Sequence, residues 1–128
     1  MLGVTYRYQV YNGTNVSVTV TVKHIQFKFA SDGSITSSSE STPISATSAT
    51  TGTYVVSSDV DNSSDKYIGS DITVTFAPGS SATGTVALYL QRSTDGGITY
   101  PSDGQGVFLG AVGFAASSAS VKKNMIVR

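Results

Sequence analysis

The stretches VTYRYQV at residues 4–10 and VSVTVTV at residues 16–22 place an apolar side chain at every second position. A period of two predicts strands that bury one face. Between them lie Asn12 and Gly13, and an Asn-Gly pair is typical of tight turns that need positive φ. The sequence therefore predicts two strands joined by a hairpin turn at Asn12-Gly13.

Similar short strands are expected along the rest of the chain, and no segment has a sustained helical period. They are predicted near residues 54–56, 72–76, 86–90, 107–114 and 122–127. We predict one all-β domain over residues 1–128, an antiparallel β-sandwich or jelly-roll-like fold. The strand at residues 86–90 is apolar on both faces, which is typical of a central strand.

Two segments depart from this pattern. After Val22 the next apolar residue is Ile25, three positions further on rather than two, so the apolar side chains would change to the other face of the strand. We therefore expect a bulge at Lys23-His24 and a surface position for His24. From Thr36 to Thr51 the chain is almost entirely Ser, Thr and Ala. Few of those side chains favour a core, so a long exposed loop or arm is predicted over residues 36–51.

Composition narrows the function classes. The chain has 128 residues, no Cys, one His, and eight basic against eight acidic residues, so its formal net charge is zero. Such a chain offers no thiolate metal site and no electrostatic attraction for nucleic acid or anionic lipid. Its most apolar stretch, residues 106–116, is about half the length that spans a bilayer. We therefore expect neither a nucleic-acid nor a membrane partner.

The sharpest motif is the segment STDGGITY at residues 93–100, which has the Asp-box pattern Ser-x-Asp-x-Gly-x-Thr-aromatic. Asp95 is expected to accept backbone N–H groups across a tight turn, and Gly97 to supply positive φ. Thr99 and Tyr100 are expected to begin the return strand. With Asn12 and Gly13, the structural-turn residues predicted are Ser93, Asp95, Gly97, Thr99 and Tyr100.

The longer segment from Val86 to Gly106, VALYLQRSTDGGITYPSDGQG, resembles a hairpin common in small all-β structural proteins of tailed bacteriophages. The resemblance implies a non-enzymatic virion protein, made in the host cytoplasm, that serves as a head decoration (cement) protein or tail component. Its partners would be copies of itself and other virion proteins, such as the major capsid or tail proteins. Contact elements are expected at residues 36–51, at the terminal segments and at residues 107–114.

Other functions have weaker support. Seven tyrosines are the basis for an alternative, a receptor- or glycan-binding module on a tail tip or cell surface, since rings stack on sugars; they are Tyr6, Tyr8, Tyr11, Tyr54, Tyr67, Tyr89 and Tyr100. The acidic loop with Asp59, Asp61 and Asp65 is a weak calcium candidate, without the Gly and Glu of an EF-hand. With one His and one Glu, we predict no catalytic residue and no cofactor.

Overall fold

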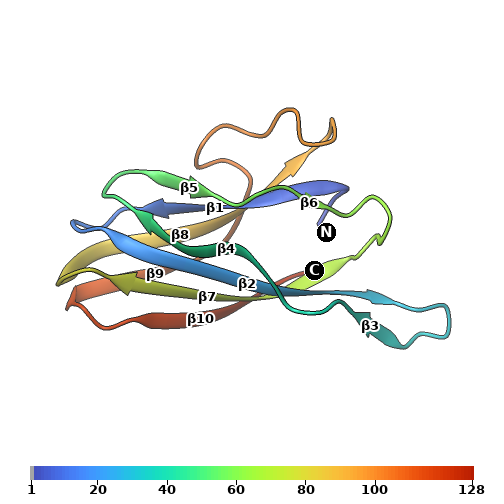
Figure 1. Cartoon of the computed structure of the whole chain (residues 1–128), viewed down its shortest axis with the longest axis horizontal. Helices are drawn as coiled ribbons and strands as arrows, with labels where there is room; N and C mark the ends of the chain where they lie inside the picture. Colours follow the sequence, from blue (N-terminus) through green and yellow to red (C-terminus); the bar gives the residue numbers. More distant parts are fainter. Residues whose placement is uncertain (1) are drawn as a thin grey trace.

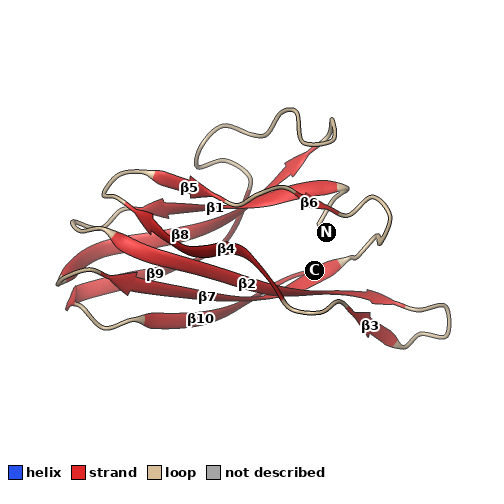
Figure 2. Ribbon diagram, viewed as in Figure 1, coloured by secondary structure: helices blue, strands red, loops and turns tan. Residues whose placement is uncertain are grey.

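The computed structural model describes residues 2–128, which form two antiparallel β-sheets packed face to face, without helices (Figures 1 and 2). The strands are β1 (Thr5–Asn12), β2 (Val18–Phe29), β3 (Ile35–Ser37), β4 (Ser41–Ala49), β5 (Tyr54–Val56), β6 (Val60–Asp61), β7 (Gly69–Pro78), β8 (Ala82–Ser93), β9 (Val107–Ser117) and β10 (Val121–Val127). The first sheet has the order β5-β1-β8-β9, and β6 also pairs with β1. The second has the order β10-β7-β2-β3, and β4 also pairs with β2. The predicted β-sandwich is confirmed.

The two longest-range pairings enclose one another along the chain: β2 pairs with β7, and β1 and β8, which flank them in the sequence, pair with each other. The register places Tyr8 opposite Leu90 in the first sheet and Val22 opposite Val74 in the second. β8 lies between β1 and β9, which confirms the central strand predicted at residues 86–90. Residues 107–114 belong to the edge strand β9.

The core fills the space between the sheets. Alternate residues of each long strand point inward, as the period of two requires. The buried side chains include Tyr6, Tyr8, Val10, Val18, Val20, Val22, Ile72, Val74, Phe76, Val86, Leu88, Leu90, Val112 and Phe114. Burial of these apolar surfaces is the main favourable contribution to folding.

The hairpin predicted at Asn12-Gly13 is wrong, because β1 and β2 lie in different sheets and do not pair. The connection crosses the sandwich instead. The Asn12 amide donates to the carbonyl oxygens of Val16 and Ala49, both at 2.8 Å, and its Oδ1 accepts the amide of Thr14 at 2.9 Å. Asn12 therefore replaces the backbone pairing that a hairpin would have supplied.

The long loop predicted over residues 36–51 is also wrong, because that segment contains the end of β3 and all of β4. β4 runs antiparallel along β2, from Ala49 opposite Val18 to Ser41 opposite His24. Strand pairing uses backbone groups and needs few apolar side chains at a sheet edge. In β4 only Ile44 and Ala49 are buried.

The bulge predicted at Lys23-His24 is absent from the pairing of β2 with its central neighbour β7, which keeps an unbroken register. Register shifts near His24 involve only the edge strand β4. The inward face continues with polar side chains, so His24 is 3% exposed rather than at the surface. Ile25 and Phe27 belong to the opposite face.

No helix long and apolar enough to cross a bilayer occurs among the residues that the structure describes.

We expect Asn12→Ala to lower the free energy of unfolding by about 2 kcal/mol, because inside the protein the carbonyl oxygen of Ala49 loses this donor and the amide of Thr14 loses its acceptor. Asn12 is fully buried. Urea unfolding measures the change. Asn124→Ala is the control, since Asn124 is exposed and bonds only the Thr73 hydroxyl, at 3.2 Å. Equal effects of the two substitutions would contradict the role given to Asn12.

Candidate functional site

The Asp-box segment forms a turn that its own side chains hold together. The Asp95 carboxylate accepts the amide of Thr99 at 2.8 Å and the Thr99 hydroxyl at 2.6 Å. The Ser93 hydroxyl donates to Asp95 at 2.7 Å and accepts the amide of Gly97 at 2.8 Å. Gly97 has a φ of 95°. The Thr99 hydroxyl and amide, together with Ser93, lower the pKa of Asp95 to about 2.

The predicted turn chemistry is confirmed, but the return strand begins at Val107 rather than at Thr99-Tyr100. Residues 101–105 instead cover the outer face of the first sheet. The Gln91 amide lies within hydrogen-bond distance of the carbonyl oxygens of Pro101 and Gln105, at 3.1 and 3.2 Å. The Gln9 amide donates to Asp103 at 2.8 Å. Both glutamines are fully buried by this loop.

Tyr100 connects the turn to the rest of the molecule. Its hydroxyl donates to Oδ1 of Asp59 at 2.7 Å, and the Arg7 guanidinium lies 4.0 Å from its ring centroid. Burial and the neighbouring Asp59 carboxylate raise the pKa of Tyr100. The Asp-box motif thus fixes the position of Asp59, a residue 41 positions away in the sequence.

Four aromatic side chains lie on the outer face of the first sheet, beside the covering loop; we call them the aromatic face, and they are Tyr11, Tyr54, Tyr89 and Phe108. Cross-strand register places Tyr11 opposite Tyr54 and Tyr89 opposite Phe108. The ring centroids are 4.7 Å apart in the first pair and 5.7 Å in the second. Phe108 is 59% exposed and Tyr54 36%.

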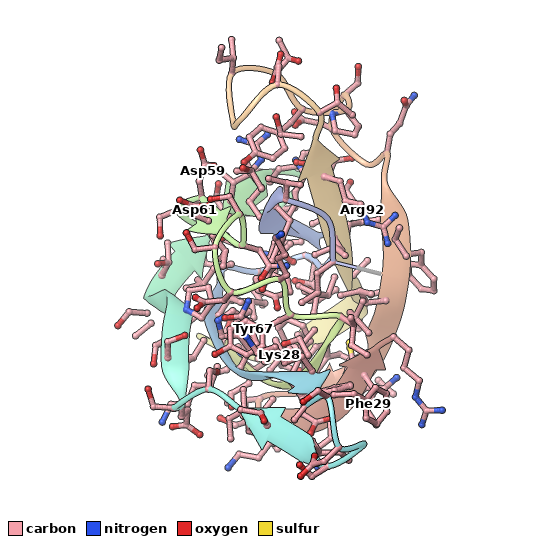
Figure 3. The ribbon with its side chains drawn as sticks, turned by 90° about the vertical axis from the view of Figure 1, so that its right-hand side faces the viewer. Lys28, Phe29, Asp59, Asp61, Tyr67 and Arg92 are labelled. Carbon is pink, nitrogen blue, oxygen red and sulfur yellow. The ribbon has the colours of Figure 1, made fainter. Side chains whose placement is uncertain are left out.

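The structure does not bring the three residues of the calcium candidate together. Oδ1 of Asp59 accepts the Tyr100 hydroxyl, Oδ1 of Asp61 accepts the amide of Ser63, and Asp65 uses its carbonyl oxygen to accept from a lysine. Within residues 2–128 no group of three or more His, Cys, Asp or Glu side chains has the arrangement of a metal site. Figure 3 shows Asp59 and Asp61 on one side of the molecule, below the loop.

A polar cluster occupies one end of the core. The Tyr8 hydroxyl lies 2.8 Å from Nδ1 of His24 and 3.3 Å from the Ser70 hydroxyl, and the Gln26 amide donates to the Tyr6 hydroxyl at 2.6 Å. Burial lowers the pKa of His24 to about 4 and raises that of Tyr8 to about 12. These groups are therefore neutral at pH 7.

A cleft of about 320 Å³ opens beside this cluster, between β2 and β4 of one sheet and residues 58–61 of the other. We call it the edge cleft. Its lining residues are His24, Gln26, Ser41, Thr42, Pro43, Ser58, Asp59, Val60 and Asp61. The cleft was not predicted, since it depends on the continued inward alternation from Val22 through His24 to Gln26.

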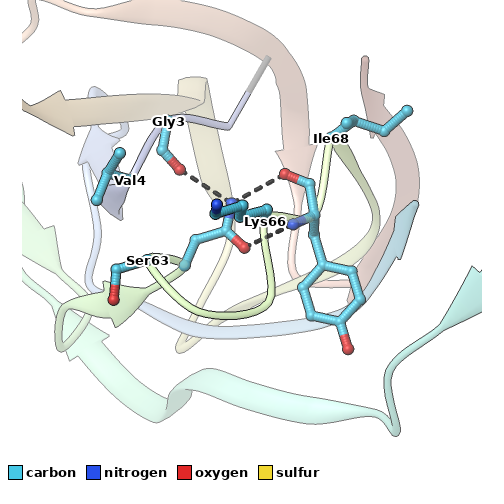
Figure 4. Close-up of a pocket in the computed structure, with 7 residues that line it drawn as sticks. Gly3, Val4, Ser63, Lys66 and Ile68 are labelled. Carbon is cyan, nitrogen blue, oxygen red and sulfur yellow. Dashed lines mark hydrogen bonds between the residues drawn. The ribbon is translucent and has the colours of Figure 1, made fainter. Parts of the chain in front are cut away.

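A second cavity, of about 270 Å³, lies where the N-terminal segment meets residues 62–68 (Figure 4). The side-chain amide of Asn62, in its wall, is already hydrogen-bonded within the protein. The Asn62 amide donates to the carbonyl oxygens of Gly3 and Tyr67, and its Oδ1 accepts the amide of Tyr67. Little of the exposed wall is polar, so this cavity offers few groups to orient a ligand.

The surroundings of His24 do not favour nucleophilic catalysis. Its Nδ1 contacts the Tyr8 hydroxyl and no carboxylate, whereas a catalytic triad orients its histidine with an acid. No protein-family model, curated protein or solved structure matches the chain.

We expect the free energy of unfolding to fall by up to about 3 kcal/mol as the pH is lowered from 6.5 to 4. The pKa of His24 is lower in the folded protein than in the unfolded chain. The unfolded chain therefore takes up a proton first, and the stabilisation present above pH 6.5 is lost as the pH falls. The contribution of Asp95 changes mainly at lower pH, as the pH falls through its ordinary pKa of 3.8 toward about 2.

Urea unfolding at several pH values measures this dependence. In His24→Gln the titrating group is absent, so the slope between pH 6.5 and 4 should flatten. An unchanged slope in the variant would assign the pH dependence to other groups.

Proposed function

We propose that this chain is a non-enzymatic structural protein of a tailed-phage virion, a head decoration (cement) protein or a tail component. It acts through multivalent contacts with copies of itself and with other virion proteins, such as the major capsid or tail proteins. Many small interfaces in a symmetric lattice or ring give a durable assembly even where each one is weak.

The observation that carries this proposal is the aromatic face. Large exposed apolar side chains gathered on one sheet face are typical of interaction surfaces, whereas single ones are ordinary. Phe108 and Tyr54 stand on the same sheet face as Val56, which is 44% exposed. Tyrosine and phenylalanine bury large areas with few rotatable bonds, which favours them at interfaces.

The edge strand β9 supports the same proposal. Exposed sheet edges usually carry charge, Pro or short strands that prevent pairing with another chain. β10 follows this pattern with Lys122 and Lys123, and β4 with Pro43. The 11 residues of β9 include no charged residue and no Pro. β9 itself therefore has little of this protection, although the ammonium of Lys123 in β10 donates to the carbonyl oxygen of Ala111 at 3.0 Å.

We expect light scattering over a hundredfold range of protein concentration to give the mass of a defined oligomer, and Phe108→Ser to shift that mass toward the monomer. Truncating the ring removes apolar contact area from the interface. Phe29→Ser is a matched control, because Phe29 is 61% exposed on the second sheet. A strict monomer at every concentration would contradict self-assembly, and equal effects of both substitutions would contradict the assigned surface.

A second candidate function, a receptor- or glycan-binding module, is favoured by the pairing of Tyr11 with Tyr54. The two rings, with centroids 4.7 Å apart and planes tilted by 35°, pack against each other, and this contact holds the 36% exposed Tyr54 as a platform on which a sugar ring can stack.

If the platform binds glycans, a glycan array should give a saturable signal that Tyr54→Ala abolishes. The substitution removes one ring of the pair without disturbing the core, because Tyr54 lies at the surface. Phe29→Ala should keep the signal, since its ring lies on the other sheet. A signal that both variants retain would place the glycan elsewhere.

A further inference from the structure

The geometry points to a side-by-side contact between copies of this chain, in which the edge strand β9 of one copy pairs with the edge strand β5 of the next. The first sheet then continues from copy to copy. The inference rests on the proposed self-assembly, which it deepens, but it does not need the virion setting. Strand direction, free backbone groups, side chains and charge carry it.

The two edges of the first sheet run in opposite directions. Each strand in the order β5-β1-β8-β9 is antiparallel to its neighbour, so β5 and β9 are antiparallel as well. A second copy placed beside the first in the same orientation therefore brings its β5 antiparallel to β9. No copy has to be inverted, so the same contact can repeat along a row of copies.

β5 has backbone groups that point away from the sheet. The amide of Ser57, which directly follows β5, donates to the carbonyl oxygen of Tyr8 in β1 at 2.9 Å. Backbone groups of successive strand residues point to opposite sides, so those of Tyr54 and Val56 point away from β1. β1 is the only strand that pairs with β5 among the described residues, so these groups form an open edge.

β9 has an open edge of the same kind. The ammonium of Lys123 donates to the carbonyl oxygen of Ala111 at 3.0 Å, from the side away from β8. The register with β8 is unbroken from Ala115 to Gly110, so the backbone groups of Ala111, Gly113 and Ala115 all point outward. A carbonyl oxygen accepts two hydrogen bonds, so Lys123 leaves one position on Ala111 for an amide of the next copy.

The outward-pointing residues of both edges carry their side chains on the outer face of the sheet. One row of opposite residues crosses the whole sheet: Tyr54, Tyr11, Ala87 and Ala111. Pairing these residues therefore keeps the cores of both copies on the same side of the extended sheet. The β9 residues are small, and a Cβ added at Gly113 would meet nothing within 4 Å, so the larger β5 side chains find room there.

The two sides of the sandwich carry opposite charge. Residues 35–61, which contain β3 to β6, have only acidic charged residues: Glu40, Asp59 and Asp61. Residues 107–127, which contain β9 and β10, have only basic ones: Lys122 and Lys123. Lys23 lies 3.7 Å from Glu40 and offsets its charge, which leaves the two aspartates. Opposite charge favours contact between unlike sides over contact between two β9 edges.

A contact between two different edges has a consequence for the assembly. It closes into a ring when the rotation between copies returns to the first copy, and otherwise it gives an open filament. β5 has only three residues, so each contact is short. We therefore expect a weak single contact that becomes durable by repetition.

Proline at an outward-pointing amide tests the pairing, because it removes the N–H that the next copy uses and keeps the bonds within the sheet. Gly113→Pro disables the β9 edge, and Val56→Pro disables the β5 edge. We expect light scattering to give the monomer mass for each variant alone, at concentrations where the unchanged chain is oligomeric. An equimolar mixture should form a one-to-one pair and nothing larger, because each variant keeps one intact edge.

Urea unfolding establishes that both variants are folded. Should a proline variant unfold, Gly113→Lys and Val56→Lys take its place, since a charged side chain on an edge strand also opposes pairing. Phe29→Ser is the control that should keep the oligomer mass, because β2 belongs to the other sheet.

The proposal is overturned if either edge variant assembles like the unchanged chain, or if the two folded variants stay monomeric when mixed. Assembly of the Val56 variant alone would identify a two-fold contact between β9 strands. A loss of mass in Phe108→Ser but in neither edge variant would also overturn it, while leaving the proposed self-assembly through the aromatic face intact. An unchanged chain that is monomeric at every concentration would contradict both.

Discussion

The hydrogen bond between the Tyr8 hydroxyl and Nδ1 of His24 joins the two sheets inside the sandwich, and much of the structure depends on it. β1 buries two tyrosines, and a buried hydroxyl without a partner costs free energy. β2 supplies the partners at the matching positions, His24 for Tyr8 and Gln26 for Tyr6. The core is therefore apolar at one end and polar at the other, and the edge cleft opens at the polar end.

Buried polar side chains also need hydrogen-bond partners on the outer face of the first sheet. Gln9 and Gln91 point away from the core, yet both are fully buried, because residues 101–105 fold over them and accept their hydrogen bonds. The Asp-box turn makes this return possible by reversing the chain within a few residues. Since Tyr100 then reaches Asp59, the same loop covers part of one sheet face and fixes one wall of the cleft.

The alternation of side chains was enough to predict the sandwich, because side-chain polarity decides which face of a strand is buried. The Asp-box turn was equally predictable, since its hydrogen bonds link residues at most four positions apart. β4 was missed because an edge strand needs little more than backbone pairing. His24 was misplaced because a polar side chain on a strand normally indicates the surface, and only its distant partner Tyr8 makes burial favourable.

The sequence names the tyrosines and residues 107–114 as candidates but does not show which side chains meet, because both candidate surfaces arise from strand register. Tyr11 and Tyr54 are 43 positions apart and meet only because β1 pairs with β5. His24 and Asp61 line one cleft because β6 pairs with β1 while β4 pairs with β2. Gly104 packs against the Tyr54 hydroxyl, and the same loop holds Asp59 through Tyr100. A subunit packed on the aromatic face would therefore also contact the loop that holds Asp59 in place.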